Sequence, residues 1–276
     1  LKHASSPPSL GTSRAAMALF AAGAAEDDCG SSDDEELPYD DDADMDEPPK
    51  RKGEKEDFPD TWVDGLLRYR FQRRIWLYSD PRGRLVKGTG TSMWSAGEVM
   101  AAYMAEHPEL YRGAACLELG AGLGGVGLTM ATCGAAHVLL TDVPRQLPLL
   151  QRNAEENFPS EVVQVRALDW RTPEHRVGLA PWNCRWSVIV GSDIGYDPEL
   201  FEPLLDTLAS QCSAETRAYF ALADREEDDE PDVKDFIEAA SSRFDCKEVH
   251  ARQLEVFQSV TKVVVLRPKA SLLASN

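Results

Sequence analysis

The fold is decided by one stretch of the sequence, Glu118-Leu119-Gly120-Ala121-Gly122-Leu123-Gly124-Gly125. A short apolar run at residues 114–118, typical of a buried strand, leads into it, and a helical run at residues 125–133 follows it. Glycines are needed where a backbone turns sharply and a ligand must approach without a Cβ in the way. The string fits both G-x-G-x-G and G-x-G-x-x-G, so it indicates a nucleotide-type cofactor without choosing between classes. A merely tight strand-to-helix turn is the alternative.

Strand-like and helical runs alternate on the C-terminal side of this stretch. Strands are predicted at residues 137–141, 162–167, 186–191 and 218–223, and helices at 144–157, 198–210 and 233–244. Two last strands, at 247–251 and 259–266, have no helix between them and should pair antiparallel at one edge. The pattern predicts an α/β fold: a Rossmann-like, seven-stranded, mostly parallel sheet with an antiparallel edge strand and helices on both faces.

On the N-terminal side, apolar residues alternate with a period of two between Tyr69 and Leu77. The turn residues Asp80-Pro81-Arg82-Gly83 and the following residues 84–87 then predict an N-terminal β-hairpin. After it, Ser95-x-x-Glu98 predicts a capping box at the start of a helix.

Acidic residues are concentrated near the N-terminus. Between Glu26 and Glu47 there are thirteen Asp or Glu residues and no Lys or Arg. Residues 1–60 carry 17 acids and 6 bases, whereas residues 61–276 carry 30 acids and 23 bases. Such a segment repels itself and has little apolar surface to bury. We therefore expect residues 1–60 to be a disordered acidic tail and residues 61–276 to form one folded domain.

The composition also argues against several functions. An acidic chain, here with a net charge of −18, gains nothing from counterion release on a phosphate backbone, so nucleic acid is not expected as a partner. The longest apolar runs are too short to span a bilayer, so no membrane association is expected. The six cysteines are scattered without a C-x-x-C pair, which indicates reduced thiols and no metal site. We expect a monomer in the cytoplasm, or also in the nucleus.

Polar and aromatic residues follow the predicted strands at their carboxyl ends, where open α/β sheets bind ligands. Asp142 stands where an acid commonly grips ribose hydroxyls, and capping a helix before Pro144 is its alternative role. Asp169 can accept a hydrogen bond from an adenine amino group, and the indole of Trp170 can cover the adenine face. Plain core packing is the alternative for Trp170, and also for Trp94.

The fourth strand ends in Gly191-Ser192-Asp193-Ile194-Gly195-Tyr196. At this position Asp193 and Tyr196 should face the reactive end of a cofactor. Methylation of an amine needs a neutral nitrogen lone pair, and a carboxylate and a phenol can orient that amine and exclude water. We therefore predict that Asp193 and Tyr196 are the catalytic residues. The alternative is that Asp193 caps the next helix.

As a set, these motifs resemble the seven-β-strand protein methyltransferases of the lysine-methylating family, often called methyltransferase-like proteins of family 16. The resemblance covers residues 61–268, and its motifs are specific together and weak singly. It implies an N-methyltransferase that uses S-adenosyl-L-methionine and modifies lysine side chains of a protein substrate, such as a chaperone or a translation factor.

By that resemblance, the residues that bind the cofactor are Trp94, Glu118, Gly120, Ala121, Gly122, Gly124, Asp142, Asp169, Trp170 and Ser192. The resemblance implies that Gly120, Ala121 and Gly122 cradle the methionine part of the cofactor and that Asp142 binds its ribose.

The same resemblance places Trp170 at the adenine and Trp94 at the other side of the cofactor. Ser192 would line the pocket, while Asp193 and Tyr196 would face the methyl-accepting residue. Two features depart from the family pattern. A glycine stands at position 195, where a bulkier apolar residue is commoner, which predicts a wider acceptor channel. The acidic tail has no counterpart in the compact family core.

Three other functions are open at this point. An NAD(P)-dependent oxidoreductase would share the glycine loop and Asp142, but it would not need Asp169-Trp170 or the Asp193-x-x-Tyr196 motif. An enzyme that methylates nucleobase amines would place Asp-Pro-Pro-Tyr at the fourth strand, where this chain has Ile194 and Gly195 in the centre. A non-catalytic protein that binds cofactor and docks partners is the third, and the intact Asp and Tyr of the motif speak against it.

Overall fold

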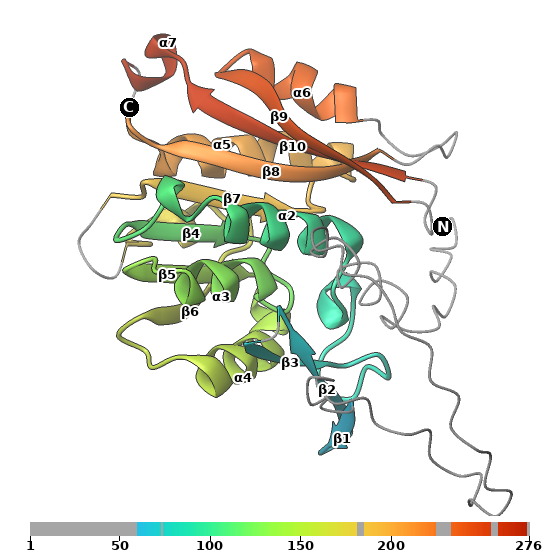
Figure 1. The fold of residues 1–276 in the computed structure, drawn as a ribbon. Helices are drawn as coiled ribbons and strands as arrows, with labels where there is room; N and C mark the ends of the chain where they lie inside the picture. The colour runs from blue at the N-terminus through green and yellow to red at the C-terminus, as the bar shows by residue number, and fades with distance from the viewer. Residues whose placement is uncertain (1–59, 73, 181–184, 225–232, 255–258, 275–276) are drawn as a thin grey trace, which may run out of the picture. The chain divides into compact units, whose positions relative to one another are not determined.

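The structure, a computed structural model, describes residues 60–72, 74–180, 185–224, 233–254 and 259–274. Its main element is a seven-stranded sheet in the order β6-β5-β4-β7-β8-β10-β9 (Figure 1). The strands are β4 (Ala115–Leu119), β5 (His137–Asp142), β6 (Val163–Ala167), β7 (Val188–Ser192), β8 (Arg217–Asp224), β9 (Phe244–Leu254) and β10 (Ser259–Pro268). Nearly all of the predicted acidic tail, residues 1–59, lies outside the described residues.

Strand direction follows the connections. β4, β5, β6, β7 and β8 pair in parallel, whereas β10 pairs antiparallel with both β8 and β9. The predicted mostly parallel sheet with antiparallel pairing at one edge is confirmed. The reversed strand is β10, which lies one place in from the edge, and β9 forms the edge itself.

Helices cover both faces of the sheet, as predicted. One face packs against α2 (Ser95–Glu106), α3 (Gly125–Thr132) and α4 (Leu147–Asn157), and the other against α5 (Phe201–Gln211) and α6 (Val233–Ser241). Alternate residues of β7 divide between the faces: Val188 and Val190 belong to the first core and Ile189 to the second. A parallel strand is buried on both sides, which is why its sequence is a continuous run of apolar residues.

The remaining helical elements are short; five lie between longer elements and α7 follows β10. They are η1 (Thr89–Thr91), η2 (Pro108–Leu110), η3 (Pro144–Gln146), η4 (Pro173–Arg176), η5 (Pro198–Leu200) and α7 (Ala270–Leu273). Four of them begin with proline, whose fixed φ suits a first helical position and whose missing N–H would have no partner there.

A separate antiparallel sheet of β1 (Thr61–Val63), β2 (Leu66–Phe71) and β3 (Ile75–Ser79) precedes α2. The predicted hairpin exists, but its turn was placed wrongly: the reversal lies between Phe71 and Ile75, and residues 84–87 form no strand. The reason is the fully buried carboxylate of Asp80. It accepts hydrogen bonds from the backbone N–H groups of residues 84, 85 and 86 at 2.6–2.9 Å, so those donors are not available to a strand.

Two asparagines of α4 hold the small sheet. Asn153 accepts a hydrogen bond from Tyr78 N and donates one to Tyr78 O, at 2.7 and 3.1 Å. One helical turn later, Asn157 bonds the N–H and C=O of Trp76 in the same way, both at 2.8 Å. The two amides therefore satisfy the outer edge of β3 as a neighbouring strand would.

The predicted capping box was wrong, although the helix is present. α2 begins at Ser95 itself with Trp94 as its N-cap, and no side chain caps it. The Ser95 hydroxyl therefore lies one residue beyond the capping position. Glu98 is partly buried instead, and this burial, opposed by the charge of Arg252, raises the pKa of its carboxyl to about 7.

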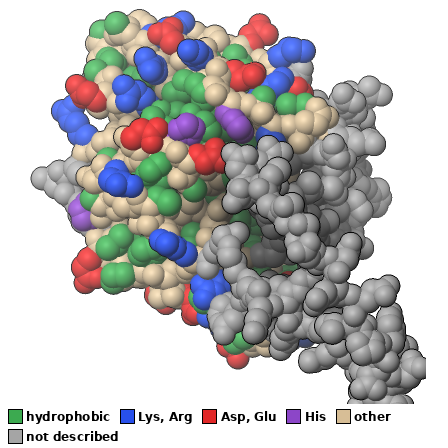
Figure 2. All heavy atoms as spheres, viewed as in Figure 1, with side chains coloured by type: hydrophobic (Ala, Val, Ile, Leu, Met, Phe, Trp, Pro, Cys, Tyr) green, Lys and Arg blue, Asp and Glu red, His purple; other side chains and the backbone are tan. Residues whose placement is uncertain are grey.

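The described surface carries both signs of charge. On the face shown in Figure 2, Lys and Arg side chains are interspersed with Asp and Glu, with no single-sign field among the residues coloured there. No helix in the described ranges is long and apolar enough to cross a membrane. The same ranges hold no group of three or more His, Cys, Asp or Glu side chains placed to bind a metal ion.

Candidate active site

The glycine-rich turn connects β4 to α3. Gly120, Gly122 and Gly124 have φ angles of +62°, +55° and +80°, in the left-handed region that side chains with a Cβ disfavour. The N–H of Ala121 donates to Thr141 O at 2.9 Å, which fixes the turn to the end of β5. The turn thus opens at the carboxyl edge of the sheet, where the sequence predicted a ligand.

The ends of three strands meet at Gly120. A Cβ at this position would lie 2.8 Å from Ile194 Cγ2 and 3.3 Å from Trp170 Cζ2. Ile194, which follows β7, also covers Gly191, where a Cβ would collide with its side chain. The structure therefore brings together the glycine loop, Trp170 after β6 and the segment after β7. The sequence reasoning missed Ile194, although an apolar residue inside Asp-x-x-Tyr beside two glycines is a usable signal.

The indole of Trp170 is both core and site. It packs against the core on the α5 face, yet its buried Nε1 has no hydrogen-bond acceptor among the described residues. A buried N–H usually has an acceptor, which a water or a ligand can supply.

Asp142 ties the end of β5 to the glycine loop. Its carboxylate accepts from Gly122 N at 2.8 Å and from Val143 N at 2.7 Å. Burial raises the pKa of Asp142, and these two hydrogen bonds act against that rise. The alternative role as a helix cap is not observed, because Val143 is the N-cap of η3 and no side chain caps it.

The segment before α2 lies beside the same loop. Gln146 is buried, and its Nε2 donates to Gly90 O at 2.6 Å and to Gly122 O at 3.3 Å. Trp94 donates from its Nε1 to Thr89 O at 2.8 Å. Gln146 is a second residue missed from the sequence, since one glutamine in a short helical turn carries no pattern.

Two predicted cofactor residues are buried. Glu118 is 1% exposed, and its carboxylate accepts from Gly127 N at 2.8 Å in the first turn of α3. Burial raises the pKa of Glu118 to about 8; the Gly127 bond lowers it and the charge of Asp142 raises it. A Cβ at Gly124 would lie 2.9 Å from Leu150 Cδ1. Both residues therefore support the turn from the core side, and their contact with a cofactor stays a prediction.

Asp193 occupies a strained position at the end of β7. Its φ is +55°, and its N–H donates to Ala221 O at 2.9 Å, one residue beyond the strand. The helix-capping alternative does not hold, because the carboxylate that caps η5 is that of Asp197, which accepts from Glu199 N at 3.0 Å. Non-glycine residues in such strain are typical of functional sites.

The neighbours of Asp193 differ in exposure. Ser192 Oγ lies against α2, 3.4 Å from where a Cβ of Gly97 would be. Tyr196 is 43% exposed. The prediction that Gly195 widens an acceptor channel was wrong. A Cβ at this position would lie 3.0 Å from Leu222 Cδ2 and 3.3 Å from the Phe236 ring. Core side chains already fill the space.

Asp169 keeps its charge at the edge of the site. Its Oδ1 accepts from the backbone N of Arg171 at 3.1 Å and from Arg171 Nε at 3.3 Å. Partial desolvation raises the pKa of Asp169, but these bonds and the nearby cations outweigh it, and the net pKa is lowered. An ionised carboxylate is an acceptor that could take a hydrogen bond from an adenine amino group.

The sheet order, the reversed β10 and the polar strand ends around a glycine turn define the methyltransferase variant of the Rossmann-like fold. The chain belongs to the lysine methyltransferase family, whose model matches residues 82–243, and thus to the methyltransferases that use S-adenosylmethionine. Family membership removes the oxidoreductase alternative.

Named relatives agree with this assignment. Protein N-lysine methyltransferase METTL21A of Danio rerio is 32% identical over 179 residues, which cover 63% of this chain and 78% of the relative. EEF1A lysine methyltransferase 3 of Xenopus tropicalis is 30% identical, covering 51% of this chain and 60% of its own. Histone-arginine methyltransferase METTL23 of Rattus norvegicus is 33% identical; the aligned part covers 43% of this chain and 52% of the relative.

Solved structures support the fold. A transferase from Pyrococcus horikoshii superposes with a TM-score of 0.52 at 14% identity, covering 75% of this chain and 74% of its own. TYW2 of the same organism, crystallised with MeSAdo, superposes with a TM-score of 0.51 at 15% identity. The superposition covers 74% of this chain and 72% of TYW2.

Proposed function

We propose that this protein transfers methyl groups from S-adenosylmethionine to lysine side chains of a protein substrate. The observation that carries the proposal is the convergence at Gly120 of the glycine turn, the Trp170 indole and Ile194. It places the family's cofactor motif directly beside the Asp193-x-x-Tyr196 segment. The names of relatives that methylate protein lysines, including those of elongation factor 1A, support the choice of acceptor.

The residues at this point fit the cofactor. The left-handed glycines Gly120 and Gly122 leave the turn without side chains beside Trp170, and the buried Trp170 Nε1 lacks an acceptor among the described residues. We assign Gly120, Ala121 and Gly122 to the methionine part, Asp142 to the ribose, and Trp170 to the adenine, as the family resemblance implies. When bound, S-adenosylmethionine supplies an electrophilic methyl carbon attached to a sulfonium.

The chain's own groups then have to present the acceptor. We assign Asp193 to orient the substrate amine by accepting its N–H hydrogen bond, and Tyr196 to wall the acceptor channel. Neither group has to be a strong base, because a lysine amine can lose its proton to water before it is held in line. Ile194 between them is buried and lies against Gly120 and Gly191.

Two measurements test the proposal. Calorimetry should show binding of S-adenosylhomocysteine and none of NAD or NADP. Incubation with tritiated cofactor and a cell lysate should label a protein on lysine, identified by mass spectrometry, and Asp193→Ala should abolish the label. If arginine is labelled instead of lysine, the assignment of the cofactor stands and the assignment of lysine as the acceptor is wrong. If the protein binds only NAD, both assignments are wrong.

A further inference from the structure

The segment that carries Asp169 and Trp170 has no strand of its own. It follows β6, where Leu168 N still donates to Asp142 O of β5 at 2.8 Å, and Asp169 O accepts from Thr172 N at 2.9 Å. Side-chain contacts add to these backbone bonds in fixing its position beside Gly120. The dipeptide is held from one side by two consecutive residues, His175 and Arg176, at the end of η4. Asp169 N donates to His175 Nδ1 at 3.0 Å, and Trp170 O accepts from Arg176 Nη2 at 2.7 Å.

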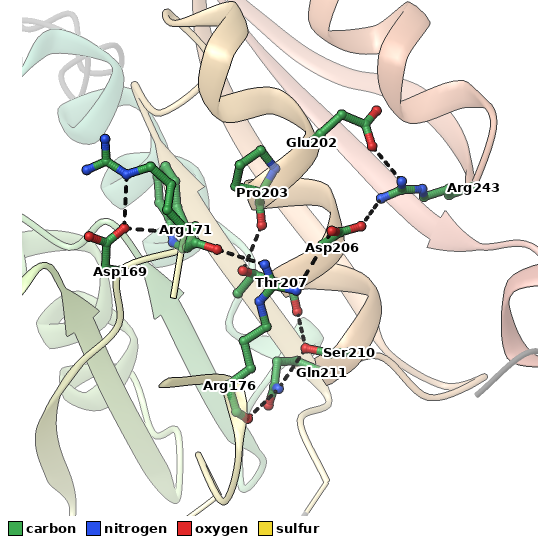
Figure 3. Close-up of polar contacts among 11 residues, drawn as sticks. Asp169, Arg171, Arg176, Glu202, Pro203, Asp206, Thr207, Ser210, Gln211 and Arg243 are labelled. Atoms are coloured by element: carbon green, nitrogen blue, oxygen red, sulfur yellow. Dashed lines mark hydrogen bonds and ion pairs between the residues drawn. The ribbon is translucent and has the colours of Figure 1, made fainter. Parts of the chain in front are cut away.

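Arg176 is itself anchored on α5. Its Nη1 lies 3.8 Å from Asp206 Oδ2, and its backbone oxygen accepts from Gln211 Nε2 at 3.1 Å. Figure 3 shows Arg176 placed between α5 and the segment of Asp169 and Arg171. The guanidinium has two arms, and here one arm holds the backbone of Trp170 while the other faces α5.

A second arginine completes the arrangement. Arg243, which precedes β9, pairs with Asp206 Oδ1 at 2.8 Å and with Glu202 Oε2 at 2.6 Å (Figure 3). Asp206 thus lies between two guanidinium groups, and the four side chains balance their charges. Half-exposed ion pairs of this kind contribute little stability. These ion pairs instead orient the Arg176 guanidinium, which donates to one particular carbonyl.

We propose that Arg176 is a positioning residue of the cofactor site: by holding the Trp170 carbonyl, it keeps the indole against Gly120. This inference rests on the proposed function for its effect on cofactor affinity. His175 fixes the other end of the same dipeptide, and α5 supplies the rigid support. In this proposal Arg176 acts through Trp170, whose backbone carbonyl it contacts.

The test compares Arg176→Met with Arg166→Met. Arg166 also donates to a backbone carbonyl, that of Gly178, in the same part of the chain but not at the Asp169-Trp170 dipeptide. Dissociation constants for S-adenosylhomocysteine are measured well below both melting temperatures. Arg176→Met should weaken binding about tenfold, the scale of one charged hydrogen bond partly lost. It should raise the KM for S-adenosylmethionine similarly, with kcat within about twofold. Arg166→Met should stay within about twofold for all three.

A second readout needs no ligand. Acrylamide quenching of Trp170 emission is obtained as the difference between each protein and its Trp170→Phe form. The quenching constant should at least double in Arg176→Met and stay unchanged in Arg166→Met. Arg176→Lys keeps the charge without the two-armed donor and should remain weaker than wild type.

The outcomes separate the two proposals. Unchanged quenching in Arg176→Met, or affinity losses equal to those of Arg166→Met, would overturn the positioning role. A wild-type protein that fails to bind S-adenosylhomocysteine, while quenching still rises in Arg176→Met, would overturn the proposed function and leave the placement of Trp170 by Arg176 standing.

Discussion

At the scale of single residues, one backbone angle orders the end of β7. The positive φ of Asp193 returns Ile194 toward Gly120 and Gly191, while the Asp193 N–H still extends the pairing with β8. Aspartate and asparagine tolerate this conformation better than other side chains. The sequence therefore places an acid where both a carboxylate and a left-handed turn are wanted.

This dual role leads to a prediction for Asp193. Asp193→Ala should lower turnover on protein substrate about a hundredfold or more, the scale of a lost orienting group. The dissociation constant for S-adenosylhomocysteine should change far less. Asp193→Asn, which keeps the tolerance for positive φ but loses the charge, separates the carboxylate from the backbone. Tyr196→Phe should be milder than Asp193→Ala, because the ring remains. Intact turnover with weakened cofactor binding would show that the roles are wrong.

Gly120 offers a second prediction with a matched control. Gly178 has the same φ, +62°, but a Cβ there would meet nothing within 4 Å. Gly178→Ala should therefore cost only the strain of the left-handed conformation, about 1–2 kcal/mol in urea unfolding. Gly120→Ala should add a loss of S-adenosylhomocysteine affinity of at least about tenfold, and Gly120→Arg should abolish binding. Equal affinities in the two alanine variants would refute a tight fit at Gly120.

At the scale of elements, α3 is capped by a residue from outside it. Its N-cap is Gly124, which has no side chain to offer, and the carboxylate of Glu118 from β4 accepts the Gly127 N–H instead. A carboxyl at a helix start suits the positive end of the helix dipole. Its complete burial, however, favours the protonated carboxyl. The helix start and the burial therefore act on the pKa of Glu118 in opposite directions, and the net effect can be measured.

The folded pKa of Glu118, about 8, lies above its ordinary value of 4.5. The unfolded carboxyl ionises first, so the folded state binds the extra proton between these limits and its stability falls as pH rises. Glu118→Gln keeps an oxygen for Gly127 but cannot titrate. Urea unfolding from pH 5 to 8 should therefore show wild type losing stability relative to the variant, by at most about 1.4 kcal/mol per pH unit. Parallel pH profiles for the two proteins would contradict the buried, titrating carboxyl.

The junction of α4 with β3 gives the next prediction. Asn153 is fully buried and bonds both backbone groups of Tyr78 as well as Leu123 O, whereas Asn157 is only partly buried. Asn153→Ala should lower the free energy of unfolding by roughly 1–3 kcal/mol for each buried group left unpaired. Asn157→Ala should cost less, because water can replace it. Equal losses in chemical denaturation would count against the difference in burial.

The elements themselves could largely be predicted from the sequence. Apolar runs and their periods located all seven strands and the main helices, because burial on one or both faces leaves a local signature. The hairpin turn and the capping box could not, since each depends on which distant donor a side chain meets. Asp80 looks like a turn residue, yet it is a buried acceptor for three N–H groups. Ser95 looks like a cap and is already inside the helix.

The candidate site was predictable in place but not in detail. Motif spacing brought Gly120, Asp142 and Trp170 to one edge of the sheet, because parallel strands end together. The inward direction of Glu118 could not be read from the sequence, since the same letters serve a cofactor or a helix start. The hydrogen bond from Arg176 to the Trp170 carbonyl could not be predicted either, because no sequence pattern links the two residues.

At the scale of the whole molecule, charge divides the chain. Residues 1–60 hold 17 of the 47 acids and only 6 of the 29 bases. A segment that repels itself and has little apolar surface contributes little to the core. Deleting residues 1–60 should leave the melting temperature and the affinity for S-adenosylhomocysteine nearly unchanged, by circular dichroism and calorimetry. A large loss of either would show that the tail docks on the domain; loss of activity on protein alone would indicate recruitment of basic partners.

The place of β10 has a consequence for how the protein is made. A ribosome synthesises β10 after the other six strands, yet it belongs between β8 and β9. Until residues 259–268 emerge, β8 ends the growing sheet with an open edge, and β9 waits without the strand it pairs with. Exposed strand edges invite pairing with other chains. In the finished sheet, where β9 is the edge strand, its exposed residues Asp245, Lys247 and Glu248 carry the kind of charge that disfavours such pairing.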